Sequence, residues 1–259
     1  MLLTIDVGNT NITCGVLDAD ILKAKFRITT KIERTSDELG LLINQFLIMN
    51  SVDPFSIDSI VVGSVVPTLN HAIISACRKS FGIDPFVIGP GIKTGIQIKT
   101  DNPKELGADR LISVVAAFQT YKQSCLVIDF GTATTFDYIS SKGEFSYTII
   151  CPGAQISANA LWKMTAKLPE IEIVECDTIL AKNTIAGMQA GIYYGYKGLV
   201  ENIIAQMVKE LKDPNIKIIA TGGLGRLFSK TIDSIDVYDP DLLFKGMKIL
   251  YDKNHLKNV

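Results

Sequence analysis

The sequence predicts an α/β protein made of two similar lobes, each a mixed sheet flanked by helices. The first reason is a repeated Asp-Gly turn: Ile5-Asp6-Val7-Gly8-Asn9-Thr10 has a counterpart in Ile128-Asp129-Phe130-Gly131-Thr132. The second is that each copy opens a run of three strand-like segments, over residues 2–29 and 125–150. The third is the alternation of strand and helix patterns elsewhere, which is typical of a sheet covered by helices. Repetition at half the chain length indicates two lobes that face each other.

The first turn lies between two strands. Apolar and β-branched residues predict one strand that ends at Asp6 and a second from about Asn11. Gly8 permits a positive φ and removes a side chain that would block an anion, and the short polar residues after it suit phosphate oxygens. Asp6, at the strand end, could hold a hydrated cation. An ordinary hairpin turn has the same pattern, so this stretch alone leaves both interpretations open.

The second copy of the turn favours phosphate binding, because two unrelated turns would not share the strands that flank them. Its sequence is CLVIDFGTATTFDYI over residues 125–139, and a third strand follows the turn at 141–143. We expect an N-terminal lobe at residues 1–120 and a C-terminal lobe at 121–259. The boundary falls in the polar stretch from Thr120 to Ser124.

Composition excludes several classes of function. Hydrophobic residues make up 47% of the chain, enough for a filled core, and the net charge of −1 gives no general attraction to nucleic acid or acidic membranes. No apolar run approaches the ~20 residues of a membrane span, and no signal peptide is expected because Asp6 interrupts the first apolar run. Five cysteines without a C-x-x-C pair and only two histidines argue against a zinc site. They predict free thiols in a reducing cytoplasm.

The remaining periodic segments predict further elements. Helices are expected over residues 35–47, 68–81, 102–119, 156–164, 184–211 and 240–251. Strands are expected over 58–63, at 87–88, in a run that reaches residue 99, and over 216–220. Residues 165–183 have no clear period and predict a surface loop.

The segment DNPKELGADRLISVVAAFQ, residues 101–119, has a strong helix-start pattern. Asn102 suits the N-cap, Pro103 the first helical position and Glu105 the third position of a capping box. Asp109 lies off the expected core stripe, which consists of Leu111, Val114, Val115 and Phe118. Its carboxylate therefore faces either solvent or a cleft.

A third glycine-rich turn, TGGLG at residues 221–225, follows a buried strand and precedes a helix. It could approach a nucleotide closely, or be only a turn. The chain contains neither G-x-G-x-x-G nor G-x-x-x-x-G-K-[ST], which argues against a dinucleotide fold and a P-loop. Phosphoryl transfer needs charge neutralisation and positioning. Our hypothesis is that Asp6 and Asp129 place cation and phosphate, and that Asp109 receives the proton of an acceptor hydroxyl.

The paired turns resemble those of the actin-like ATPase superfamily, which has a duplicated ribonuclease H-like fold and grips phosphates from both sides. Together with Gly107-Ala108-Asp109-Arg110 and the run from Asn183-Thr184 to Gly187-Met188-Gln189, they resemble type III pantothenate kinases over essentially the whole chain. Sugar kinases share the first turn but not an N-P-x-x-L-G-A-D-R segment. The resemblance implies ATP-dependent phosphorylation of pantothenate, the first step of coenzyme A biosynthesis, with Mg²⁺ and a monovalent cation, K⁺ or NH₄⁺.

Carried over residue by residue, the resemblance also implies the roles of individual side chains. The implied ATP-binding residues are Asp6, Val7, Gly8, Asn9, Thr10, Asn11, Ile12, Thr13 and Thr132. The implied pantothenate-binding residues are Gly107, Ala108, Asp109, Arg110 and Thr184. Asp109 would be the proton acceptor, Arg110 would meet the substrate carboxylate, and Asp129 would hold the monovalent cation.

One position departs from the family. An aromatic residue usually precedes the Asp-Asn-Pro, where this chain has Thr100, which removes an expected apolar contact with pantothenate. Two alternatives stay open at this point: another small-molecule kinase of the superfamily, or a non-catalytic homologue that binds nucleotide and acts as a regulator. The presence of Asp6, Asp109 and Asp129 favours an enzyme.

The long helix predicted at 184–211 carries four glycines on one face: Gly187, Gly191, Gly195 and Gly198. Each mid-helix glycine costs about 1 kcal/mol relative to alanine, so the stripe indicates something packed close to the backbone. Either the chain's own sheet or a second copy could pack there. The resemblance implies a homodimer in which Thr184 reaches the partner's site.

Overall fold

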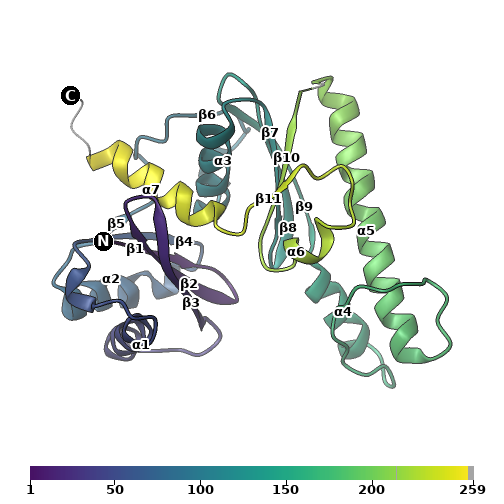
Figure 1. The fold of residues 1–259 in the computed structure, drawn as a ribbon, viewed down its shortest axis with the longest axis horizontal. Coiled ribbons are helices and arrows are strands. Elements are labelled where there is room, and N and C mark those ends of the chain that lie inside the picture. Colours follow the sequence, from purple (N-terminus) through teal and green to yellow (C-terminus); the bar gives the residue numbers. More distant parts are fainter. Residues whose placement is uncertain (214, 256–259) are drawn as a thin grey trace. The chain divides into compact units, whose positions relative to one another are not determined.

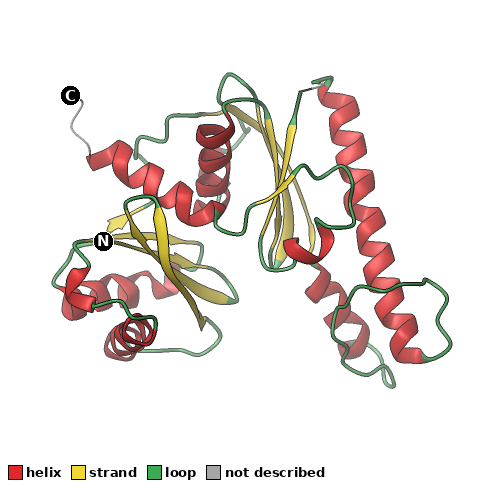
Figure 2. Cartoon of the chain, in the orientation of Figure 1, coloured by secondary structure: helices red, strands yellow, loops and turns green. Residues whose placement is uncertain are grey.

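Two sheets with the same core strand order form the framework of the chain (Figures 1 and 2). The computed structural model describes residues 1–213 and 215–255. Unit 1 comprises Met1–Gln97, Asp101–Ala116 and the segment from Leu242 onward, and unit 2 comprises Ile98–Thr100 and Ala117–Asp241. The last helix therefore belongs to unit 1, whereas the sequence pattern assigns it to the second lobe.

The sheet of unit 1 has the strand order β3-β2-β1-β4-β5. Its first three strands are the predicted antiparallel run, β1 (Leu2–Val7), β2 (Asn11–Asp18) and β3 (Ile21–Thr29). β4 (Ser59–Ser64) pairs in parallel with β1, and β5 (Phe86–Val87) pairs in parallel with β4. The parallel register places Asp6 opposite Gly63.

Helices cover the sheet of unit 1 on both faces. α1 (Ser36–Met49) begins with the predicted capping box of Thr35 and Glu38, and it packs with α2 (Pro67–Phe81) on the face that contains Ile5. α7 (Leu242–His255) and the first part of α3 (Ala108–Tyr121) cover the other face. A short 3₁₀ turn, η1 (Pro54–Ser56), follows α1.

The predicted helix start at Asn102 is wrong, because α3 begins only at Ala108. Pro103–Glu105 form only a 3₁₀ turn, η2, and the extended backbone of Leu106 (φ −71°, ψ 115°) separates it from α3. Asn102 donates its side-chain amide to Glu105 Oε1 at 2.6 Å and caps no helix. Residues 111–117 are all buried, so the expected core stripe covers only part of the buried surface, and Phe118 is half-buried.

The sheet of unit 2 has the order β11-β10-β7-β8-β9-β6, whose first five strands match the order in unit 1. The repeat is confirmed in β7 (Cys125–Phe130), β8 (Ala133–Ile139) and β9 (Glu144–Pro152). β10 (Lys217–Thr221) pairs in parallel with β7. Two short edge strands, β11 (Val237–Tyr238) and β6 (Gln97–Ile98), complete the sheet, and β11 was not predicted.

The long helix α5 (Thr184–Leu211) has the predicted bounds and lies along one face of the unit 2 sheet. Its buried residues Tyr193, Tyr196 and Val200 join Ile128 and Phe136 in the core of the unit. α4 (Ala154–Lys163) and the short α6 (Gly225–Phe228) complete the helices of this unit. Within the described ranges, no helix is both long and apolar enough to cross a membrane.

The glycine stripe of α5 does not pack against the chain's own sheet. Gly187, Gly191, Gly195 and Gly198 are exposed. A Cβ added at any of the last three would meet no described atom within 4 Å. The first of the two explanations for the stripe is therefore excluded for the described residues.

Candidate active site

The first Asp-Gly turn is held tightly by backbone hydrogen bonds. Gly8 N–H donates to the Asn11 carbonyl at 3.0 Å, and Thr30 Oγ1 donates to the Gly8 carbonyl at 2.7 Å. A Cβ at Gly8 would lie 3.1 Å from the Asn11 oxygen and 3.9 Å from Asp6 Oδ2. A side chain at Gly8 would therefore crowd the turn beside the Asp6 carboxylate, whereas glycine leaves its backbone open to a ligand.

The start of α3 holds Asp109 in a folded-back conformation. Asp109 Oδ1 accepts the backbone N–H of Arg110 at 2.8 Å. A Cβ at Gly107 would lie 2.6 Å from this same oxygen and 3.3 Å from Val65 Cγ1. The observed position of the Asp109 carboxylate therefore requires glycine at position 107, because a side chain there would overlap Oδ1. Asp109 and Arg110 are both half-buried, which excludes the fully solvated face that the sequence left open.

Backbone pairing brings the first turn and the start of α3 to the same end of the unit 1 sheet. Val65, which contacts Gly107, donates its backbone N–H to the Val7 carbonyl at 3.0 Å, and Gly8 is the next residue. Strand alternation turns Asp6 away from Ile5 and toward Gly63, against which Ile112 of α3 packs. Two carboxylates, Asp6 and Asp109, thus share the carboxyl end of β1 and β4, where open α/β sheets bind ligands.

The second Asp-Gly turn lies among three glycines of unit 2. A Cβ at Gly222, whose φ is +86°, would lie 2.3 Å from Asp129 Oδ1, and one at Gly131 would lie 3.5 Å from it. A Cβ at Gly153 would lie 2.3 Å from the Thr132 carbonyl oxygen, to which Gly153 N–H donates at 3.2 Å. The turn, the TGGLG loop and the start of α4 therefore surround Asp129 with backbone, and we call these three segments the glycine cradle.

Two predicted residues of unit 2 are exposed. Thr132 lies in the turn of the glycine cradle, and Thr184 begins α5 directly after its N-cap. Asn183 Oδ1 accepts the backbone N–H of Ala186 at 2.9 Å, which fixes this helix start. Thr184 can therefore present its hydroxyl outward from α5.

The described residues contain no group of three or more Asp, Glu, His or Cys side chains arranged to hold a metal ion. Mg²⁺ in kinases usually takes one or two carboxylates and completes its shell with phosphate oxygens and water. A single half-buried carboxylate, Asp6, beside an open glycine turn fits that kind of site.

The cysteines do not supply a nucleophile. Burial raises the pKa of Cys77 and of Cys125 to about 12, and it also raises the pKa of Cys14. All five cysteines are free thiols. These three buried thiols stay protonated at neutral pH, which argues against covalent catalysis by a thiolate.

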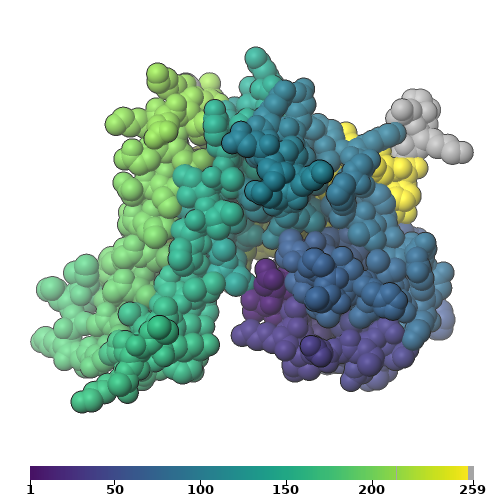
Figure 3. All heavy atoms as spheres, turned by 180° about the vertical axis from the view of Figure 1, so that it is seen from behind, coloured from purple at the N-terminus to yellow at the C-terminus, as the bar shows by residue number. Residues whose placement is uncertain are grey.

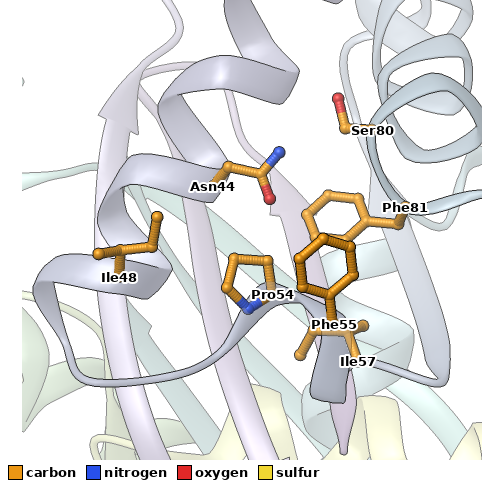
Figure 4. A pocket seen from close by; sticks show the side chains of 7 residues that line it. All are labelled: Asn44, Ile48, Pro54, Phe55, Ile57, Ser80 and Phe81. Atoms are coloured by element: carbon orange, nitrogen blue, oxygen red, sulfur yellow. The ribbon is translucent and has the colours of Figure 1, made fainter.

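A separate hollow of about 400 Å³ lies in unit 1 between α1, η1 and α2 (Figure 4). Its lining is mostly apolar and consists of Asn44, Ile48, Pro54, Phe55, Ile57, Ser80 and Phe81. None of these is a predicted site residue, and none carries a charge. The hollow therefore supplies no group for phosphoryl transfer.

Sequence reasoning missed the part that Gly153 plays in the cradle. A glycine permits close backbone approach, but nothing in the local sequence identifies Gly153 as such a position. The contact between Gly153 and Thr132 depends on the pairing of β8 with β9, which places Ala133 opposite Pro152. No local pattern contains that information.

Similarity to known proteins identifies the family of the chain. A family model described as "Type III pantothenate kinase" matches residues 2–206. A type III pantothenate kinase of Agathobacter rectalis is 50% identical over 259 residues, covering 100% of both chains. One of Bifidobacterium longum is 49% identical over 254 residues, covering 98% of this chain and 99% of the relative.

A solved structure supports the fold. A candidate 2-dehydro-3-deoxygalactonokinase of Sinorhizobium meliloti matches with a TM-score of 0.63 at 12% identity, covering 100% of this chain and 98% of that one. A likeness at this identity concerns the fold alone. It confirms the predicted two-lobed α/β class.

Proposed function

The chain belongs to the type III pantothenate kinase family, and from this premise we propose how its residues divide the reaction. The protein is a kinase that phosphorylates pantothenate to 4'-phosphopantothenate, the first step of coenzyme A biosynthesis. It uses ATP and a divalent metal ion, as its family implies. The single observation that carries the site assignment is that Asp6 and Asp109 share one end of the unit 1 sheet.

In this proposal the first turn binds the phosphates of ATP. The segment from Asp6 to Thr13 offers backbone N–H groups around Gly8, where no side chain intervenes. The divalent ion, when bound, neutralises phosphate charge, and Asp6 is the residue that would hold it.

Asp109 serves as the base and Arg110 as the partner of the pantothenate carboxylate. As the acceptor oxygen attacks the γ-phosphorus, its proton passes to the Asp109 carboxylate and the bond from phosphorus to the ADP oxygen breaks. The Arg110 backbone N–H, bonded to Asp109 Oδ1, fixes the base in position. The guanidinium of Arg110 suits a carboxylate because its donors form a planar fork.

The glycine cradle of unit 2 is proposed to hold the monovalent cation at Asp129 and to contact ATP through Thr132. Carboxylate and carbonyl oxygens are the ligands that hard cations prefer. Asp129 Oδ1 is surrounded by Gly131 and Gly222, so an ion there would meet backbone rather than bulky side chains. A K⁺ or NH₄⁺ ion would add positive charge near the phosphates.

A homodimer is proposed from the exposed apolar surface of unit 2. The second half of β9, Tyr147–Ile150, is exposed along its whole length, and Ile150 is 59% exposed. Met164 and Leu180 are exposed by 84% and 81%. Figure 3 shows the spheres of α4 and of the loop after it (teal to green) standing out from the rest of unit 2. Exposed apolar side chains favour an interaction site, and the unpacked glycine stripe of α5 lies on the same unit.

We also propose that the enzyme works in the cytoplasm with its thiols reduced. The five free cysteines support this location.

The first test is an acceptor assay. ATP-dependent phosphorylation should occur with pantothenate and not with hexoses or acetate, because Arg110 and Asp109 require a carboxylate and a hydroxyl on one molecule. Product formation is measured by mass spectrometry, with and without K⁺. Turnover of a sugar at a rate above that of pantothenate would contradict the substrate assignment.

Asp109→Asn should leave ATP binding nearly intact but lower kcat by roughly 10²–10⁴, the usual range for a lost general base. Single-turnover kinetics and ATP titration of the purified variant measure the two quantities. Asp84→Asn is a matched control, because Asp84 is exposed and pairs with Arg78 at 2.8 Å away from the site. Near-parental turnover in Asp109→Asn would contradict the assignment of Asp109 as the base.

Asp129→Ala should abolish or strongly weaken the response of the reaction to K⁺ or NH₄⁺, because the proposed ion loses its charged ligand. The rate is titrated with KCl while choline chloride keeps the ionic strength constant. An unchanged titration curve in the variant would mean that the ion binds elsewhere, or that none is used.

Light scattering should give about twice the 28.3 kDa chain mass. Mixing Asp109→Asn with Thr184→Arg should restore about a quarter of parental activity, because half of the dimers are mixed and each keeps one of two sites intact. A mixture of Asp109→Asn with the double variant is the control and should stay inactive. If subunits exchange and the first mixture also stays inactive, the shared site is wrong.

A further inference from the structure

Tyr196 is a buried tyrosine of α5 whose hydroxyl reaches the glycine cradle. The side chain is 5% exposed, and its hydroxyl is hydrogen-bonded to Thr134 Oγ1, which is fully buried. The Tyr196 side chain lies in the same buried cluster as Ala154, the first residue of α4. Burial raises the pKa of Tyr196 to about 12. The phenol is therefore neutral at physiological pH and acts through hydrogen bonds.

Thr134 lies in β8 directly after the turn of the cradle, and Ala154 is the first residue of α4. Thr134 is the second residue after Thr132, and its strand pairs it with Cys151. Ala154 follows Gly153, which donates to the Thr132 carbonyl at 3.2 Å. The hydroxyl is therefore bonded to the strand that leaves the turn, and the Tyr196 side chain packs in the cluster that contains the start of α4.

The ring of Tyr196 contacts the remaining part of the cradle. Its centroid lies 4.9 Å from that of Phe228 in α6, directly after the TGGLG loop, and 6.4 Å from that of Phe130, next to Asp129. Phe130 and Phe228 stack on each other at 5.6 Å. One side chain thus packs in the buried cluster that contains Phe130, Ala154 and Phe228.

We propose that Tyr196 is a positioning residue that fixes the glycine cradle in the geometry that binds nucleotide phosphate and the monovalent cation. It does not contact substrate in this proposal. It acts through its hydrogen bond to Thr134 and through the buried cluster that contains Ala154, and a shift of either residue would move Thr132 or Gly153 by way of the backbone. The inference rests on the proposed function of the cradle, namely ATP contact at Thr132 and the cation at Asp129.

The test compares Tyr196→Phe with Tyr194→Phe by calorimetric titration of Mg·ATP, with and without K⁺. Tyr196→Phe keeps the ring and removes only the hydroxyl. Tyr194 is the matched control, because it lies on the same helix and donates its hydroxyl to the Cys176 carbonyl at 2.7 Å, outside the cradle. The Kd for Mg·ATP and the half-saturating K⁺ concentration should each rise about tenfold in Tyr196→Phe, as expected for a lost buried hydrogen bond. Tyr194→Phe should keep both constants.

Substitutions at Thr134 provide a second, independent test of the proposal. Thr134→Val should weaken ATP and K⁺ binding to the same extent, Thr134→Ser should keep parental constants, and Tyr196→Phe with Thr134→Val should be no worse than either alone. If Tyr196→Phe fails to fold by circular dichroism, the comparison of Val with Ser at position 134 decides. Parental ATP and K⁺ constants in the folded variants, with only a lower Tm, would overturn the inference.

Asp129→Ala, titrated in parallel, separates this inference from the proposed function. If Asp129→Ala loses K⁺ dependence while Tyr196→Phe and Thr134→Val do not, only the positioning role fails. If Asp129→Ala also keeps parental constants, the cation site of the cradle fails, and the positioning role fails with it.

Discussion

The structure depends on the close approach of backbone to a carboxylate at the end of the first strand of each sheet. In unit 1 the absent side chain of Gly8 leaves the turn open beside Asp6, and in unit 2 Gly222 lies against Asp129. An added methyl group at Gly222 would overlap the carboxylate, and its φ of +86° disfavours any other residue. Glycine at these two positions is therefore a geometric requirement of the site.

Parallel pairing of β4 with β1 brings the residues of the candidate site to one end of the unit 1 sheet. It allows the Val65 backbone N–H to bond the Val7 carbonyl, next to the first turn. Val65 also lies close to Gly107, which precedes α3, so the start of α3 lies beside this turn. The Asp109 carboxylate, the proposed base, is held there by the backbone of the same helical turn. In unit 2 the equivalent parallel pairing, β10 with β7, brings the TGGLG loop to Asp129. The same parallel pairing thus occurs in both sheets and places the proposed phosphate and acceptor groups.

Local patterns predicted the elements that have strong local causes. The strands after each turn followed from β-branched and apolar residues. The helix α5 has its predicted bounds, and the structure shows Asn183 as its N-cap. The predicted helix start at Asn102 was wrong, because the Asn102 amide donates to the Glu105 side chain and caps no helix. The role of Gly153, the partners of Tyr196 and the packing of α7 on unit 1 are contacts between distant segments. No spacing in the sequence encodes which sheet a helix returns to.

The central claim is that the two carboxylates at one end of unit 1 have separate tasks, with Asp6 beside the phosphates and Asp109 beside the acceptor hydroxyl. A crystal structure of the chain with Mg²⁺, a non-hydrolysable ATP analogue and pantothenate tests it most directly. The account predicts the pantothenate hydroxyl within about 3 Å of an Asp109 oxygen, a hydrogen-bonding distance for a general base, and the phosphates against the Gly8 turn. Pantothenate bound with its hydroxyl facing any other carboxylate, or phosphates bound away from Gly8, would contradict it.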